Sequence, residues 1–125
     1  MDVRRKKMKY SIPFLEMLMM RLRGIPVGKV NRELKKVERH SLDVDHVFLQ
    51  AHFLAGGDIY DLMESIIFSK ENGMKLNTQT ACAGQLMSQY QENVTFTEKL
   101  KVMRSEGIRD ANDFLSKGSN NKPEL

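Results

Sequence analysis

Tryptophan is absent from this sequence of 125 residues, and cysteine occurs only once, at Cys82. A single cysteine cannot form a disulfide within the chain, so the fold does not depend on an oxidising compartment. Proline occurs only three times and glycine eight times, so the composition does not indicate a disordered chain. Apolar residues make up 41% and charged residues 29%, a balance typical of a folded globular protein.

Long hydrophobic runs are also missing. The longest apolar stretch, FLEMLMM at residues 14–20, contains Glu16, whereas a transmembrane helix needs ~20 apolar residues. A basic beginning before an apolar stretch is similar to a signal peptide, but no small-residue cleavage site follows it. We therefore expect no transmembrane helix, no export and a cytoplasmic location.

Charge is distributed unequally along the chain. Residues 1–39 contain twelve Lys or Arg and four Asp or Glu, whereas residues 40–125 contain eight and twelve. A basic segment is typical of chains that meet phosphate, in nucleic acid or in lipid headgroups, and it also occurs as a solvated tail. These interpretations stay open from composition alone. The residues expected to face a membrane or phosphate are Arg4, Arg5, Lys6, Lys7 and Lys9.

Helical periodicity dominates the sequence, and strand signals are weak because no stretch alternates apolar and polar residues for more than a few positions. The sequence predicts an all-α fold, a compact bundle of about five to seven short helices with helix-turn-helix units. We expect a basic N-terminal tail over residues 1–10, a single helical domain over residues 11–116 and a flexible C-terminal tail over residues 117–125.

Apolar residues at helical spacing mark the face that each early helix is expected to bury. The first stripe consists of Phe14, Leu15, Leu18, Met19 and Leu22. Burial of this stripe is the expectation, because helices this short need one another's faces, and contact with a lipid interface or a partner helix is the alternative. A second helix, opened by Pro26, combines Val27, Val30, Leu34 and Val37 with the basic residues Lys29, Arg32, Lys35, Lys36 and Arg39.

Later helices are predicted from the same periodicity. The clearest stripe is Ile59, Leu62, Met63, Ile66 and Ile67. Less regular faces consist of Val47, Phe48, Ala51, Leu54 and Ala55, then of Ala83, Leu86, Met87 and Tyr90, and then of Leu100, Val102 and Met103. A last short helix is expected from about Ile108 to Leu115.

A double glycine separates two predicted helices in AHFLAGGDIYDLME, residues 51–64. Gly56 or Gly57 can adopt the left-handed conformation that ends a helix, and Asp58 can cap the next helix by accepting a bond from a first-turn amide. His52 is expected to be partly buried beside this turn. We interpret His52, Gly56, Gly57 and Asp58 as a helix-corner motif that supplies shape rather than chemistry.

A faint internal repeat relates the segment that begins at Leu42 to the segment that begins at Met74. Two tandem helix-turn-helix units would produce it, although so few matches also arise by chance. The first unit contains Leu42, Val44, Leu49 and Leu54, which correspond at one constant spacing to Met74, Leu76, Ala81 and Leu86 in the second unit.

Three phrases carry a resemblance to a known family: MRLRGIP at residues 20–26, LDVDHVFLQAHFLAGGDI at 42–59 and TACAGQL at 80–86. Over about residues 10–87 the chain resembles the juxtamembrane helical segment of the bacterial flotillin-like membrane scaffold proteins. Residues 50–58 carry most of the specificity, since the family shows a phrase similar to LEAHYLAGGNV there.

The resemblance implies a membrane insertion before this segment, a cytoplasmic position for the helices, a mixed α/β domain and an oligomer-forming coiled coil. The chain departs from that pattern, because it contains neither the insertion nor a strand-rich region. It also has GQLMSQYQ at residues 84–91, where the family shows a phrase similar to DLAGRDV. The resemblance therefore implies one helical module, either excised or stand-alone, rather than a self-anchoring, large assembly.

Signals for catalysis, metal binding and cofactor binding are poor. The histidines at His40, His46 and His52 are spaced by steps of six, which do not place them on one face of a helix as metal chelation requires. Cys82 lies between two alanines, with no histidine or acid nearby in sequence to activate it. No phosphate-binding glycine loop occurs. We expect no enzyme activity, no cofactor, no metal and no small-molecule substrate.

Two functional classes follow from these observations. The first is a scaffold or adaptor module that acts through a protein partner or homo-oligomer and through an anionic membrane, at the inner face of the cell membrane. The alternative is a small helix-turn-helix nucleic-acid-binding protein, since a basic helix can lie on phosphates. Asp58, Asp61 and Glu64 oppose that alternative, because they occupy the expected recognition helix.

Overall fold

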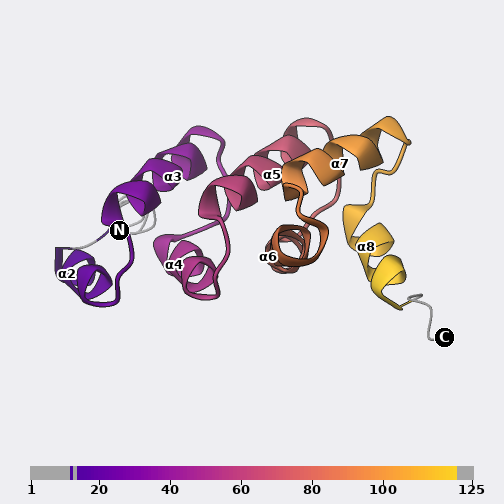
Figure 1. The fold of residues 1–125 in the computed structure, drawn as a ribbon. Helices are drawn as coiled ribbons and strands as arrows, with labels where there is room; N and C mark the ends of the chain where they lie inside the picture. The colour runs from indigo at the N-terminus through magenta and orange to yellow at the C-terminus, as the bar shows by residue number, and fades with distance from the viewer. Residues whose placement is uncertain (1–11, 13, 121–125) are drawn as a thin grey trace. The chain divides into compact units, whose positions relative to one another are not determined.

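Helices form the regular structure of residues 12 and 14–120, the part of the chain that the computed structural model describes (Figure 1). The helices of this part are α2 (Phe14–Leu22), α3 (Val27–Arg39), α4 (His46–Leu54), α5 (Ile59–Glu71), α6 (Thr78–Met87), the π-helix η1 (Ser88–Glu92), α7 (Phe96–Ser105) and α8 (Ala111–Asn120). The predicted all-α class with about five to seven short helices is confirmed.

The chain divides into two compact units, with the boundary between Tyr60 and Asp61. In the first unit, α3 packs against both α2 and α4. In the second unit, α6 packs against α8 and continues into η1, which packs against α7. The single domain predicted over residues 11–116 remains a prediction. The tail predicted over residues 1–10 and the last residues, 121–125, lie outside the described residues.

The helix bounds repeat at the spacing found in the sequence. Helices α2 and α4 are both nine residues long, and they begin at Phe14 and His46. Helices α3 and α5 are both 13 residues long, and they begin at Val27 and Ile59. Both offsets equal the one that separates Leu42 from Met74, and the same step leads from the start of α4 to the start of α6 at Thr78. The repeat is therefore present in local structure as well as in apolar pattern.

The same chain reversal ends most of these helices. A residue with positive φ follows the helix, and the next amide donates to the carbonyl oxygen five positions earlier, as in a Schellman cap. The donor and acceptor pairs are Ile25 to Met20 (2.9 Å), Leu42 to Val37 (2.9 Å), Gly57 to His52 (3.0 Å), Met74 to Ser69 (2.8 Å) and Ile108 to Met103 (3.0 Å). Each bond satisfies a carbonyl group that the helix end leaves unpaired, so the reversal is held without tertiary contacts.

Side chains cap the starts of several of the following helices. The Asp45 carboxylate accepts from the Phe48 amide at 2.9 Å, and the Asn77 side chain accepts from the Thr80 amide at 2.7 Å. These two caps recur at the same spacing as the helices that they begin. Thr95 caps α7 in the same way, with its hydroxyl accepting from the Glu98 amide at 3.2 Å. Caps of this kind stabilise a helix by about 1 kcal/mol each.

The apolar stripes predicted for α3 and α5 are buried. Val27 of the α3 stripe is only half-buried. The buried members are Val30, Leu34 and Val37 in α3, and Ile59, Leu62, Met63, Ile66 and Ile67 in α5. Each such side chain stabilises the fold by about 1.5–3 kcal/mol through removal of apolar surface from water. These two helices therefore supply much of the described core.

The faces predicted for α4 and α6 were wrong. Leu54 is 57% exposed, and Tyr90 and Met87 are also exposed. Polar side chains are buried in their place: Gln50 and His52 in α4, and Gln85 and Ser88 at the end of α6 and the start of η1. Hydrogen bonds explain why burial of a polar group is tolerated here, since Gln50 bonds to His46 at 2.9 Å and Gln85 bonds to Gln89 at 2.9 Å.

Helix α8 begins later and continues further than the sequence predicts. The Lys75 amide donates to the Arg109 carbonyl at 2.7 Å, and the Ala111 amide donates to the Lys75 carbonyl at 2.9 Å. These two bonds hold the chain before α8 as an isolated parallel bridge. The helix therefore begins at Ala111 and runs to Asn120, instead of spanning Ile108 to Leu115.

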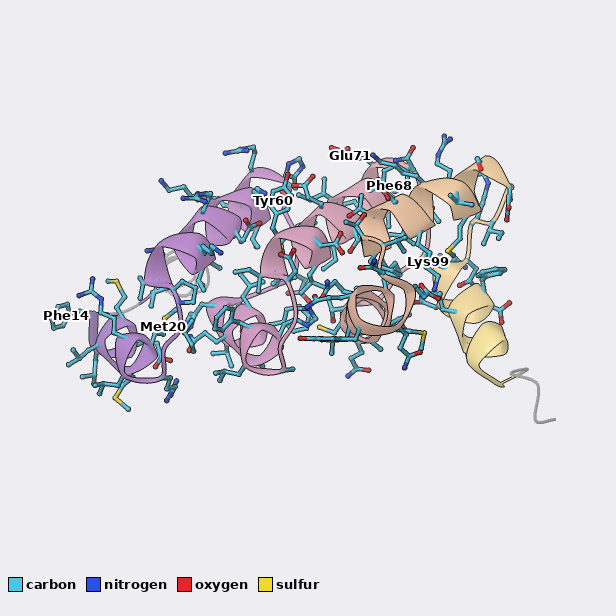
Figure 2. All side chains as sticks on the ribbon, viewed as in Figure 1. Phe14, Met20, Tyr60, Phe68, Glu71 and Lys99 are labelled. Atoms are coloured by element: carbon cyan, nitrogen blue, oxygen red, sulfur yellow. The ribbon has the colours of Figure 1, made fainter. Side chains whose placement is uncertain are left out.

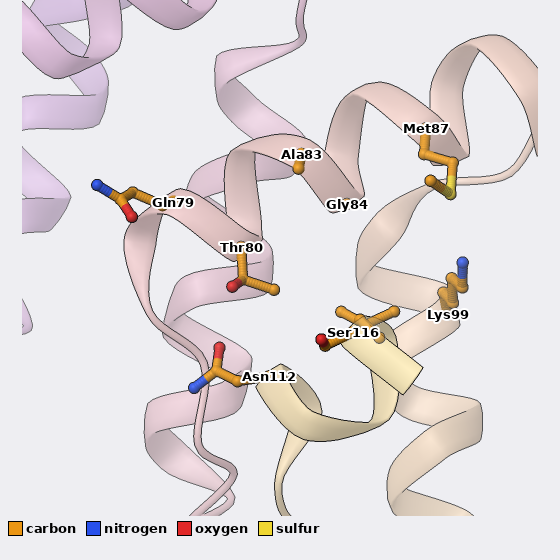
Figure 3. Close-up of a pocket in the computed structure, with 9 residues that line it drawn as sticks. Gln79, Thr80, Ala83, Gly84, Met87, Lys99, Asn112 and Ser116 are labelled. Atoms are coloured by element: carbon orange, nitrogen blue, oxygen red, sulfur yellow. The ribbon is translucent and has the colours of Figure 1, made fainter. Parts of the chain in front are cut away.

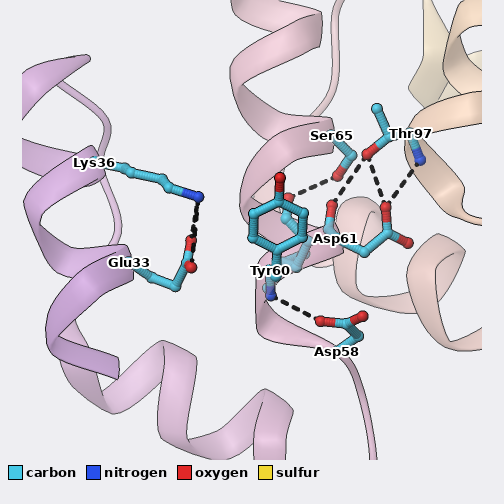
Figure 4. A network of polar contacts seen from close by, with 8 residues as sticks. Glu33, Lys36, Asp58, Tyr60, Asp61, Ser65 and Thr97 are labelled. Atoms are coloured by element: carbon cyan, nitrogen blue, oxygen red, sulfur yellow. Dashed lines mark hydrogen bonds and ion pairs between the residues drawn. The ribbon is translucent and has the colours of Figure 1, made fainter. Parts of the chain in front are cut away.

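A buried carboxylate joins α5 to α7 in the second unit (Figure 4). Asp61 accepts from the Phe96 amide at 2.8 Å and from the Thr97 amide at 3.2 Å. The Thr97 hydroxyl adds a bond of 2.7 Å to the same carboxylate. Since first-turn amides have no partner within their own helix, Asp61 caps α7 from another element and fixes where α7 begins.

Replacement of Asp61 by alanine is predicted to lower the free energy of unfolding by about 2–4 kcal/mol, because buried first-turn amides lose their acceptor. Urea denaturation followed by circular dichroism measures the change. The matched control is Glu38→Ala on α3, whose side chain is exposed and should change stability by less than about 0.5 kcal/mol. Equal effects from the two substitutions would contradict the capping role.

Candidate functional site

Helix α2 presents its apolar side chains to solvent. Phe14 is 78% exposed and Leu18 is 48% exposed, while Met20 on the other side of the helix is fully buried (Figure 2). We call the exposed set the apolar α2 surface; it consists of Phe14, Leu15, Leu18, Met19 and Leu22. The expectation that these residues are buried in a helical core was therefore wrong. A contiguous apolar strip of this kind on a protein surface is typical of a contact site.

Comparison of α2 with α4, one repeat later, explains the exposure. Leu18 corresponds to Gln50, which is only 4% exposed. Arg23, in the turn after α2, donates to the side-chain oxygen of Gln50 at 3.4 Å. The turn of the first helix pair thus contacts the first helix of the next pair. Among the described residues, no earlier helix pair is present to cover α2 in the same way.

Basic residues flank the apolar α2 surface. Arg21 and Arg23 are both exposed, and Arg23 lies 3.5 Å from Glu16 in a surface ion pair of little energetic weight. The predicted membrane- or phosphate-facing residues Arg4, Arg5, Lys6, Lys7 and Lys9 lie outside the described residues. None of the helices in the described ranges has the length and apolar character needed to cross a bilayer.

The basic helix α3 carries exposed cations on one side and one buried ion pair. The exposed cations are Lys29, Arg32, Lys35 and Arg39. Lys36 differs from them in burial, and its ammonium lies 3.1 Å from the buried Glu33 carboxylate and 4.3 Å from the centre of the Tyr60 ring (Figure 4). The ammonium group of Lys36 therefore forms an ion pair and a cation–π contact within the first unit.

The four residues of the predicted helix-corner motif lie together. His52 is buried at the end of α4, and Gly56 has φ +92°, a conformation in which any side chain would be strained. A Cβ atom placed on Gly57 would lie 2.2 Å from Nε2 of His52, so only glycine fits beside the ring. Asp58 accepts from the Tyr60 amide at 2.9 Å and caps α5. The arrangement shapes the turn between α4 and α5.

A pocket of about 310 Å³ lies in the second unit (Figure 3). Its lining is Gln79, Thr80, Ala83, Gly84, Met87, Lys99, Asn112, Leu115 and Ser116. Lys99 is the only ionisable group in this lining, and it pairs with Glu92 at 3.0 Å. Acid-base catalysis needs a positioned acid and base, and this lining offers no such pair.

Cys82 is half-buried in α6, where burial raises the pKa of its thiol to about 11. A thiol becomes a nucleophile only after deprotonation, so this shift opposes reactivity at neutral pH. In the described part of the chain, no group of three or more His, Cys, Asp or Glu side chains is placed to hold a metal ion.

A Gly57→Ala substitution is predicted to destabilise the protein by about 1–3 kcal/mol, because the added methyl group overlaps the buried His52 ring. Thermal or urea unfolding measures the loss. Gly28→Ala is the matched control, since nothing lies within 4 Å of a Cβ at that helical position, and it should stabilise by about 0.5–1 kcal/mol. If His52→Ala does not reduce the cost of Gly57→Ala in the double variant, the overlap is not its cause.

The thiol of Cys82 is predicted to react with iodoacetamide at pH 8 about 100-fold more slowly in the native chain than in urea. The reason is the rise of its pKa from 9.0 to about 11, which lowers the thiolate fraction. Mass spectrometry of timed, quenched samples gives both rates. Equal rates in the folded and unfolded chain would show that the thiol is not shielded.

Comparison with known proteins identifies the family of this chain. A family model described as Flotillin-like protein FloA matches residues 3–112. A flotillin-like protein FloA from Dictyoglomus turgidum (strain DSM 6724 / Z-1310) is 32% identical over 74 residues. That alignment covers 58% of this chain and 22% of the relative, so the chain spans less than a quarter of that protein, and no solved structure matches. As the resemblance over residues 10–87 predicts, the chain belongs to the flotillin-like FloA family.

Proposed function

We propose that this chain is a non-enzymatic scaffold or adaptor module that binds an anionic membrane surface through the apolar α2 surface. The observation that carries the proposal is the exposure of five large apolar side chains on one short helix, flanked by arginines. Membership of a membrane scaffold family supports the same partner. The chain would act at the inner face of the cell membrane, where anionic lipids gather.

The physical basis is interfacial binding by a short amphipathic helix. Phe14 and Leu18 would enter the boundary between headgroups and acyl chains, where they leave water at about 25 cal/mol per Å². The basic residues would remain among the headgroups and contribute about 1 kcal/mol each. Since α2 is only nine residues long, binding through it should be reversible and should depend on both the apolar and the basic contribution.

Protein contacts complete the proposed role. The pocket lined by α6 and α8 offers no acid-base pair suited to catalysis, and the glycine and histidine of the helix-corner motif shape a turn. A module built in this way acts by offering its surfaces for contact with other proteins. Its partners are another protein or further copies of the chain, with no small-molecule substrate or cofactor.

Flotation with vesicles tests the membrane proposal. The full chain should float with vesicles that contain phosphatidylglycerol and not with pure phosphatidylcholine vesicles, and salt should weaken binding. Leu18→Glu should reduce the bound fraction about tenfold or more, because a charge replaces an exposed apolar contact. Val47→Glu is the control, since Val47 is 59% exposed on α4, outside the apolar α2 surface. Charge reversal at Arg4, Arg5, Lys6 and Lys7 should also weaken binding.

Two results would contradict the membrane proposal. One is equal flotation of the Leu18→Glu and Val47→Glu variants. The other is steeply salt-dependent binding to random DNA duplex that Leu18→Glu leaves unchanged, together with no flotation at low salt. That second result would support the nucleic-acid alternative and assign the exposed cations of α3 to phosphate contact.

A further inference from the structure

A second exposed apolar site lies in the other unit, between α7 and α8. It is a groove of about 430 Å³, which we call the α7–α8 groove. Its lining is Glu92, Val94, Glu98, Lys99, Val102, Met103, Glu106 and Phe114. Val94, Val102 and Phe114 are large apolar side chains that remain substantially exposed.

The chain reversals set the register between α5 and α7, because Gly73 and the bond from Met74 to Ser69 correspond to Gly107 and the bond from Ile108 to Met103. In this register the buried residues of one helix match those of the other: Leu62, Ile66 and Ser69 of α5 correspond to Phe96, Leu100 and Met103 of α7. Val102 corresponds to Phe68, which is only half-buried. Val102 therefore lies on a side of the helix that the core leaves accessible in both helices, and it is 56% exposed there.

The charges around the groove select the kind of partner. Three glutamates line it, and its one lysine, Lys99, is already paired with Glu92 at 3.0 Å. An occupant that satisfies both the apolar floor and this acidic rim must be an apolar helix flanked by basic residues. The apolar α2 surface has that composition, with Leu18 exposed and with Arg21 and Arg23 exposed beside it.

We propose that the α7–α8 groove binds α2 of a second copy of this chain. Because the two surfaces differ, the contact is heterologous, and successive copies associate head to tail. The apolar residues of α2 contact Val102 and Phe114, and the arginines that follow lie near the glutamates. The inference rests on the exposed α2 of the proposed function, and it makes self-association and membrane binding compete for one helix.

Sedimentation velocity of the full chain, at low salt and without lipid, tests the self-association. The wild-type chain should associate with rising concentration, and added salt should weaken the association. Val102→Glu in the groove and Leu18→Glu on α2 should each raise the dissociation constant by about tenfold or more. Val47→Glu, with similar exposure on α4, should leave it unchanged. Circular dichroism of each variant verifies that the helices remain folded.

Mixing the two variants distinguishes a heterologous contact from a symmetric one. The Val102→Glu chain keeps an intact α2, and the Leu18→Glu chain keeps an intact groove, so an equal mixture should form dimers and stop there. Association of Val102→Glu as strong as that of the wild type would overturn the proposal, because it would indicate contact between two α2 helices. A monomeric wild-type chain, or a mixture without dimers, would overturn it as well.

Vesicle flotation separates this proposal from the membrane proposal. Val102→Glu should float with anionic vesicles like the wild type while it fails to self-associate. A wild-type chain that floats but stays monomeric without lipid would overturn the groove proposal and leave membrane binding intact. A chain that self-associates through the groove but never floats would support the groove proposal and overturn membrane binding.

Discussion

A single local constraint shapes the described part of the chain: the reversal that ends most helices by a positive-φ residue and a backbone bond to a carbonyl five residues earlier. The step from the bond at Ile25 to the bond at Gly57 equals the step from the bond at Leu42 to the bond at Met74. Since each bond is formed by the backbone alone, it fixes the path of the chain before side chains pack. The positions of the helices along the sequence, and hence the buried face of each helix, follow from it.

Each unit also has an exposed apolar surface. In the first unit, the turn after α2 contacts Gln50 on α4 through Arg23. Helix α2 has no such cover among the described residues, and its leucines stay in water. In the second unit, Val102 is exposed in the α7–α8 groove together with Val94 and Phe114. Repeat proteins commonly use polar capping units at such positions, and apolar residues there indicate a partner.

Much of the helical framework could be predicted from the sequence, because capping residues and apolar stripes depend on neighbours in the chain. The stripe from Ile59 to Ile67 identified the buried face of α5, and Asp58 identified its start. Other features depend on residues distant in sequence. Gln50 is buried, and Arg23 and His46 both bond to its side chain. Apolar periodicity treats a polar residue such as Gln50 as exposed. The buried faces of α4 and α6 were therefore assigned wrongly. Periodicity likewise identifies the apolar side of α2 but cannot show what covers it.

The central claim is that α2 presents an uncovered apolar surface for contact. A nitroxide label at Leu18→Cys, in a chain with Cys82→Ala, measures this directly by electron paramagnetic resonance. The account predicts a mobile, water-accessible label in the free chain at low concentration, and an oxygen-accessible label shielded from an aqueous nickel complex after anionic vesicles are added. A label that is immobile and inaccessible in the dilute chain, or that stays aqueous with vesicles, would contradict it.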